Sequence, residues 1–143
     1  MAFQLFSGKA EIEWYPKAAS QAFSNGALTY WNGTGGLIPA DSTSGDHAGI
    51  ILRDVLSTDS DYATTGAKVP VLVPGPNAVF LVDVGTGSLA TTDVGNFVDL
   101  TNSLSIDVTA SSKDAVLIRG YVSATKALVK INSMAFNKDV ATT

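Results

Sequence analysis

The side chain best suited to acid–base chemistry is a single histidine, His47. A nucleophilic triad needs a serine, a histidine and an acid that the fold brings together. His47 follows the polar run 41–46, and the chain contains no Gly-x-Ser-x-Gly nucleophile elbow. We therefore expect His47 to be a solvated loop histidine or an interface histidine, and we do not expect it to be a catalytic base.

Paired carboxylates form a second possible centre, because two of them can hydrolyse a glycosidic bond. The candidates are Asp54, Asp59, Asp61, Asp93 and Asp99. All of them lie in or beside predicted turns, where an aspartate commonly bonds its own backbone. We expect turn aspartates here, without a catalytic pair.

Metal-ligating patterns are weak. Asp59-Ser60-Asp61 resembles the start of a calcium loop, but an EF-hand would need glycine at position 64 and a carboxylate at position 70, where this chain has Thr64 and Pro70. The chain has no cysteine and one histidine, which excludes thiolate and multi-histidine sites. We predict no metal, and a looser calcium site built from loop aspartates stays the alternative.

Patterns for phosphate or nucleic acid are also missing. The glycine-rich runs 33–36 and 85–88 do not end in Lys-Ser or Lys-Thr, as a phosphate-binding loop would. Lys126 and Lys130 would share one solvated strand face, and the net charge is −4, whereas a nucleic-acid-binding protein usually has a basic surface. The sequence thus indicates a protein that is not an enzyme, has no cofactor and does not bind nucleic acid directly.

The composition favours strands. The 143 residues fit one domain, of which 45% are hydrophobic and 15% charged, against about 25% charged in ordinary soluble domains. Glutamate and glutamine, which favour helices, each occur twice. We predict an all-β fold, a small β-sandwich or β-barrel-like domain. So little charge also suggests a protein that packs against something else.

Turn residues divide the chain from residue 25 into short strands. We predict a β-hairpin over residues 27–40, further strands over 49–56, 68–73, 79–84, 97–100 and 105–109, and a closing hairpin over 115–122 and 127–131. The 49–56 segment is apolar enough for a buried central strand. The 68–73 segment is expected at a sheet edge, because Pro70 cannot donate to a ladder.

The N-terminal segment differs from the rest in its aperiodic aromatic content. We predict an extended strap over residues 1–24 that could serve as an interaction arm, a β domain over 25–136, and a frayed tail over 137–143. The strap either folds back on its own core or reaches a neighbouring molecule, and in the second case its deletion would weaken binding more than folding. Its candidate contact residues are Phe3, Leu5, Phe6, Trp14 and Tyr15.

In the order of these elements, residues 14–132 resemble a head decoration (cement) protein of a tailed bacteriophage. The residues that carry the resemblance are Trp14-Tyr15-Pro16-Lys17, Gly26-Ala27-Leu28-Thr29-Tyr30, Gly36-Leu37-Ile38-Pro39-Ala40, Gly49-Ile50-Ile51-Leu52, Val69-Pro70-Val71, Asp93-Val94-Gly95, Phe97-Val98-Asp99-Leu100, Arg119-Gly120-Tyr121 and Lys126-Ala127-Leu128-Val129-Lys130.

The resemblance implies a structural virion protein. Such a protein binds the outer surface of the expanded capsid, often as a homotrimer, and clamps neighbouring major capsid subunits. The expected partners are the major capsid protein and further copies of the chain, with no membrane involved. The expected location is the outer capsid surface of the virion, after synthesis in the host cytoplasm.

A second interpretation is a carbohydrate- or ligand-binding β module, such as a tail or fibre component. Tyr30, Trp31 and Tyr62 would stack on sugar rings in that case. A β-rich enzyme is a third interpretation, which loss of an activity in a His47→Ala variant would support.

Overall fold

The computed structural model describes residues 2–44 and 47–132 of the chain. This part forms eleven strands and one short 3₁₀ turn, without an α-helix. The elements are β1 (Gln4–Ser7), β2 (Ala10–Pro16), β3 (Leu28–Trp31), β4 (Leu37–Pro39), β5 (Gly49–Ile51), β6 (Lys68–Pro74), β7 (Val79–Thr86), η1 (Thr91–Asp93), β8 (Phe97–Asn102), β9 (Ser105–Asp107), β10 (Val116–Ser123) and β11 (Lys126–Ile131).

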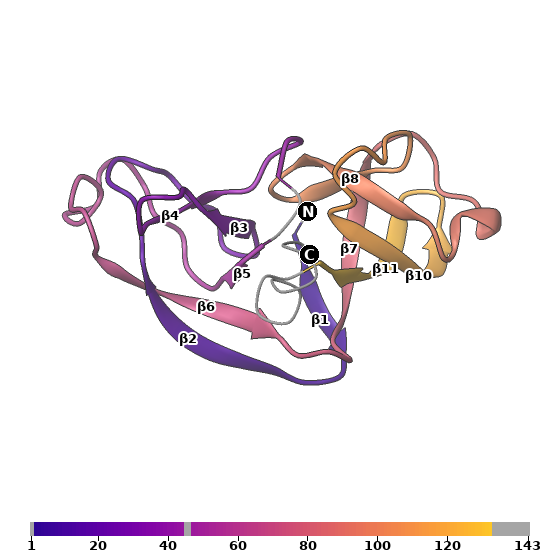
Figure 1. The fold of residues 1–143 in the computed structure, drawn as a ribbon, viewed down its shortest axis with the longest axis horizontal. Helices are drawn as coiled ribbons and strands as arrows, with labels where there is room; N and C mark the ends of the chain where they lie inside the picture. Colours follow the sequence, from indigo (N-terminus) through magenta and orange to yellow (C-terminus); the bar gives the residue numbers. More distant parts are fainter. Residues whose placement is uncertain (1, 45–46, 133–143) are drawn as a thin grey trace.

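The C-terminal half forms a closed barrel. Its strands follow the order β7-β11-β10-β8-β9, and β9 returns to pair with β7. That closing pair is parallel, with Asp83 opposite Ser105, whereas the other barrel pairs are antiparallel. β1 extends the barrel sheet by pairing with the first part of β7, on the edge of β7 opposite β11. Figure 1 shows this barrel at the right.

The other strands form an open antiparallel sheet, at the left of Figure 1, with the order β2-β6-β5-β3-β4. β3 and β4 are the hairpin predicted over residues 27–40, and β5 is a short central strand within the predicted segment 49–56. Together the two sheets confirm the all-β prediction and its barrel-like form.

The middle of the open sheet is covered on both faces. Consecutive side chains of a strand point to opposite faces, and β5 places Ile50 in the barrel core and Ile51 in a second core. Both side chains are buried. The barrel core also includes Phe3, Leu28, Phe80, Leu100, Ile106 and Val129. The second core includes Phe23, Leu37, Val55, Val69 and Val71.

The predicted position of the 68–73 strand at a sheet edge is wrong. β6 lies inside the open sheet, between β2 and β5. The carbonyl oxygen of Pro70 accepts a hydrogen bond from the Leu52 backbone N–H at 2.9 Å. Because the N and C=O groups of a strand residue point to the same side, the missing Pro70 N–H lies on the β5 side. β5 ends at Ile51, so the proline removes no bond of the ladder to β2.

The predicted strap consists largely of strands that belong to the two sheets. β1 joins the barrel sheet, and β2 pairs with β6 along its whole length, from Ala10–Pro74 to Pro16–Lys68. The side chains of Phe3 and Phe23 are each only 3% exposed. Residues 2–24 therefore pack on their own domain, which was the first of the two alternatives. The predicted tail, 137–143, lies outside the described residues.

Candidate interaction surfaces

His47 is buried within the domain, which corrects the prediction of a solvated loop histidine or an interface histidine. Its Nε2 lies 3.1 Å from the Oγ of Ser44, and its Nδ1 lies 3.2 Å from the carbonyl oxygen of Asn132. Ser44 is also buried, and its hydroxyl donates to the carbonyl oxygen of Asp41 at 2.9 Å. The histidine joins the 41–44 loop to the end of β11, and the side chains of both Ser44 and His47 are buried.

The exposed-loop aspartates bond nearby backbone or an arginine. The carboxylates of Asp54, Asp59 and Asp93 accept backbone N–H bonds from Asn25, Leu56 and Ala90 respectively, and Asp61 pairs with Arg53. Within the described residues, no three His, Cys, Asp or Glu side chains gather closely enough to hold a metal ion. Also within that part of the chain, no helix has the length and apolar character needed to span a membrane.

Asp99 is the exception among the aspartates, because it is buried. Its Oδ1 accepts the backbone N–H groups of Lys113 at 2.7 Å and Asp114 at 2.9 Å. Its Oδ2 accepts the backbone N–H and the hydroxyl of Ser112, both at 3.1 Å. One carboxylate therefore holds the whole loop before β10.

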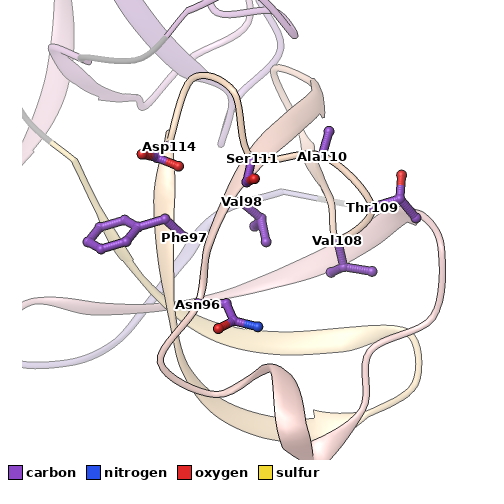
Figure 2. Close-up of a pocket in the computed structure, with 8 residues that line it drawn as sticks. All are labelled: Asn96, Phe97, Val98, Val108, Thr109, Ala110, Ser111 and Asp114. Carbon is purple, nitrogen blue, oxygen red and sulfur yellow. The ribbon is translucent and has the colours of Figure 1, made fainter.

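That loop borders a pocket of about 360 Å³ at one end of the barrel, shown in Figure 2. The lining comes from the start of β8, the segment after β9 and the loop before β10, and consists of Asn96, Phe97, Val98, Val108, Thr109, Ala110, Ser111 and Asp114. Phe97 is 47% exposed, and Asp114 is the only charged residue in the lining. Asp114 has a positive φ of 53°. The pocket thus combines one aromatic ring with several polar groups.

The three aromatic residues predicted to stack on sugars do not form a joint platform. Trp31 packs against Tyr15, with ring centroids 5.1 Å apart and planes at 50°. Trp31 and Tyr62 lie against the second core, while Tyr30 lies against the barrel core. Burial raises the pKa of Tyr30, and the Asp41 carboxylate adds to this increase. These rings serve mainly to cover the two cores.

The five predicted contact residues differ in their accessibility. Phe6 and Trp14 are strongly exposed, at 62% and 61%, and Leu5 is also exposed. Tyr15 is half-buried against Trp31, and Phe3 is in the barrel core, so it offers no surface. The strong exposure of these large apolar side chains on β1 and β2 marks this region as a candidate contact surface.

The sequence analysis missed one member of this surface, Ile12, which is 58% exposed. The alternation Glu11-Ile12-Glu13-Trp14 places Ile12 and Trp14 on one face of β2. That pattern was available in the sequence, but an apolar face of a strand normally indicates a core. Hereafter the β1–β2 surface is the collective name for the exposed apolar residues of these two strands, which are Leu5, Phe6, Ile12 and Trp14.

A second group of exposed apolar side chains belongs to the barrel. Its members are Val94, Phe97, Tyr121 and Val122. They come from β8, β10 and the segment after η1. The strand β10 contacts the other two elements, because Val116 pairs with Val98 of β8, and the Gly95 N–H after η1 donates to the Ile118 carbonyl oxygen at 2.8 Å. The protein therefore has apolar surface on both its open sheet and its barrel.

No protein-family model matches this chain, and no curated protein matches it. The function has to be argued from the surfaces described above.

Proposed function

We propose that this protein is a structural virion protein without catalytic activity. It binds the outer surface of an expanded phage capsid and stabilises the capsid by clamping neighbouring major capsid subunits. The observation that carries the proposal is the β1–β2 surface, where Phe6, Ile12 and Trp14 are each more than half exposed. Apolar side chains exposed to this degree on ordered strands favour a protein contact.

The composition supports a permanent contact. Only 15% of the residues are charged, and the cores of stable interfaces are depleted in charged residues. The second apolar group, on the barrel, supplies a surface for further copies of the chain. A homotrimer that contacts several capsid subunits at once would gain affinity by effective concentration, even if each contact were weak.

Co-sedimentation with capsids that lack this protein tests the proposal. The purified chain should bind expanded capsids saturably and leave unexpanded procapsids unoccupied, and the stoichiometry should reveal the symmetry of the site. A Phe6→Ser/Trp14→Ser variant should lose most of this binding. A Leu56→Ser variant is the matched control, because Leu56 is 54% exposed but lies outside the β1–β2 surface. Absence of wild-type binding to expanded capsids would refute the proposal.

A second candidate function is binding of a small polar ligand such as a carbohydrate. The pocket in Figure 2 favours it, because its lining includes the exposed aromatic Phe97 together with the polar Asn96 and Asp114. An aromatic face with a few polar groups is a common arrangement in ligand sites. A glycan array tests this function: a bound glycan should be lost in both Phe97→Ala and Asn96→Ala variants, and retained in Tyr62→Phe.

A further inference from the structure

Among the described residues, β2 is an edge strand whose outer backbone groups have no strand partner. In the order of the open sheet, β2 has β6 as its neighbour on one side, and no strand of residues 2–44 and 47–132 pairs with its other side. The strand is seven residues long. An unpaired edge of this length is a ready template for another strand.

The hydrogen bonds at the two ends of β2 show which of its residues face outward. The Gly75 N–H donates to the Lys9 carbonyl oxygen, and the Lys17 N–H donates to that of Ala67, both at 2.9 Å. Odd-numbered residues therefore face β6, and the period of two turns the backbone N–H and C=O groups of Ala10, Ile12 and Trp14 away from it.

The side chains on the two faces of β2 differ in character. Ile12 and Trp14 form an exposed apolar face. On the opposite face, Glu11 and Glu13 are exposed and pair with Val73 and Val71 of β6. Each face therefore specifies the kind of residue that an added strand would place beside it.

The acidic face also has a groove. A pocket of about 280 Å³ is lined by Glu11 and Glu13 on one side and by the apolar Val73 and Pro76 on the other, with Lys9, Ala10, Pro74 and Gly75 completing it. Lysine and arginine lay an aliphatic stem on apolar surface while their charged end reaches a carboxylate. Lys9 is the one cation in the lining, and it lies at the start of the strand, just before Ala10. Because Lys9 would repel a second cation, the Glu13 end of the groove suits an incoming lysine or arginine best.

We propose that the free edge of β2 accepts an extended segment of the major capsid protein in which apolar residues alternate with lysine or arginine. The segment becomes a sixth strand of the open sheet, with its apolar side chains beside Ile12 and Trp14 and its cations beside Glu11 and Glu13. Strand addition of this kind takes its affinity from backbone bonds and its specificity from alternate side chains. The inference rests on the proposed function and specifies its partner.

Charge argues against a second copy of β2 as the occupant. In a two-fold antiparallel pairing centred on Ile12, Glu11 of each copy would lie opposite Glu13 of the other. Centring the pair on Glu13 places two Glu13 carboxylates opposite each other. Like charges directly opposite one another destabilise a strand pair, whereas a basic segment removes this repulsion.

An Ile12→Pro variant tests the backbone bonds. The Ile12 N–H points away from β6, so proline leaves the β2–β6 ladder intact and deprives the added strand of one donor. The matched control is Ile12→Thr, which also loses the apolar side chain but keeps the N–H. Relative to this control, we expect Ile12→Pro to bind expanded capsids roughly tenfold more weakly. The reason is that proline removes one hydrogen bond to the added strand and its ring obstructs the approach of that strand. Urea unfolding of both variants verifies that they are folded.

A Glu11→Gln/Glu13→Gln variant tests the charges. It keeps the shape of both side chains and should weaken capsid binding by about three- to tenfold at low salt, with the difference from wild type shrinking as salt is raised. Equal capsid affinity of Ile12→Pro and Ile12→Thr, or an unchanged affinity of the double glutamine variant, would overturn the inference while leaving the proposed function intact.

A peptide experiment on the full-length wild-type chain separates the two proposals. The probe is a ten-residue peptide of alternating valine and arginine, and amide hydrogen exchange of Ile12 and Trp14 is the readout. We expect these amides to be protected by this peptide and not by its valine–glutamate counterpart or by a version N-methylated at alternate residues. If wild type fails to bind capsids, the proposed function falls, and this protection alone upholds the acceptor edge. The acceptor edge would be refuted if the Ile12 and Trp14 amides stayed unprotected with the valine–arginine peptide. It would also be refuted if self-association of the chain without peptide protected them equally.

Discussion

Replacing Asp99 by asparagine should destabilise the domain strongly, because this buried carboxylate accepts four hydrogen bonds. Asparagine keeps one oxygen, so one pair of donors stays satisfied. Its NH₂ group then faces the other pair, either the Ser112 N–H and hydroxyl or the N–H groups of Lys113 and Asp114. Two donors therefore lose their acceptor and face the asparagine NH₂ group, which is itself a donor.

The magnitude follows from the bonds that are lost. A hydrogen bond to a charged group contributes about 1.5–3 kcal/mol. Two lost bonds would total up to about 6 kcal/mol, but the neighbouring loop residues 111–114 are exposed and their N–H groups can find water. We therefore expect a loss of about 3 kcal/mol, a large share of the roughly 5–15 kcal/mol of a typical domain.

Urea unfolding at neutral pH measures this loss, with amide exchange of Ser112, Lys113 and Asp114 as a local readout. The midpoint should fall while the slope of the transition stays the same. The control is Asp107→Asn, because the Asp107 carboxylate accepts two bonds from Thr109 at the surface, and its loss should be about 0.5 kcal/mol. A loss below about 1 kcal/mol for Asp99→Asn would refute the view that one carboxylate fixes this loop.

Three further predictions concern other parts of the fold. The Lys126 ammonium, 2.6 Å from the Asp83 carboxylate, lowers the pKa of Asp83 below its ordinary value. A lowered pKa contributes stability at neutral pH that is lost as the pH falls through the folded-state pKa. Because the pair is partly exposed, the free energy of unfolding of wild type should be about 0.5 kcal/mol higher than that of Asp83→Asn at pH 7. Urea unfolding should show no such difference at about pH 2. A difference that persists at this low pH would contradict the assignment. Gly49 has a φ of 150°, and an added Cβ would lie 2.4 Å from a backbone oxygen of β6, so thermal unfolding should show Gly49→Ala to be destabilised by about 2–4 kcal/mol. A near-neutral result would mean that β5 shifts freely. Acrylamide should quench Trp14 in a Trp31→Phe variant much more than Trp31 in a Trp14→Phe variant, because Trp14 is 61% exposed and Trp31 packs on Tyr15; equal quenching would be inconsistent with an exposed β2 face.

Local pattern predicted the local elements well. The hairpin over residues 27–40 follows from its glycine-rich turn, and Val79–Thr86 and the β10–β11 hairpin follow from their apolar and β-branched residues. Each of these depends on neighbours in sequence. The same local pattern also suggested that the 49–56 strand is central, which the open sheet confirms for Gly49–Ile51.

Long-range arrangement was beyond the sequence. Nothing local to Ser105–Asp107 indicates that it pairs in parallel with β7 and closes the barrel. Pro70 was interpreted as an edge residue, because the direction of its missing N–H and the end of β5 depend on tertiary structure. His47 was expected in solvent or at an interface, because its polar loop gave no indication that the end of β11 covers it. Among the predicted contact residues, the exposure of Phe6 and the burial of Phe3 depend on how β1 pairs with β7.

The pairing of the first strands with late partners sets the order in which the chain can fold. Residue 4 pairs with residue 81, and residue 12 pairs with residue 72. Closing such long loops is entropically costly, and non-local strand pairing slows folding. During synthesis β1 and β2 must wait on the ribosome for β6 and β7, and Phe3, which is buried in the folded domain, stays uncovered until then. When the complete chain refolds, the hairpins β3–β4 and β10–β11 pair with neighbours in sequence, so they would nucleate first, and the N-terminal strands would dock last and complete the cooperative unit. Folding rate should therefore respond to substitutions in β10 and β11, and unfolding rate to those in β1 and β2.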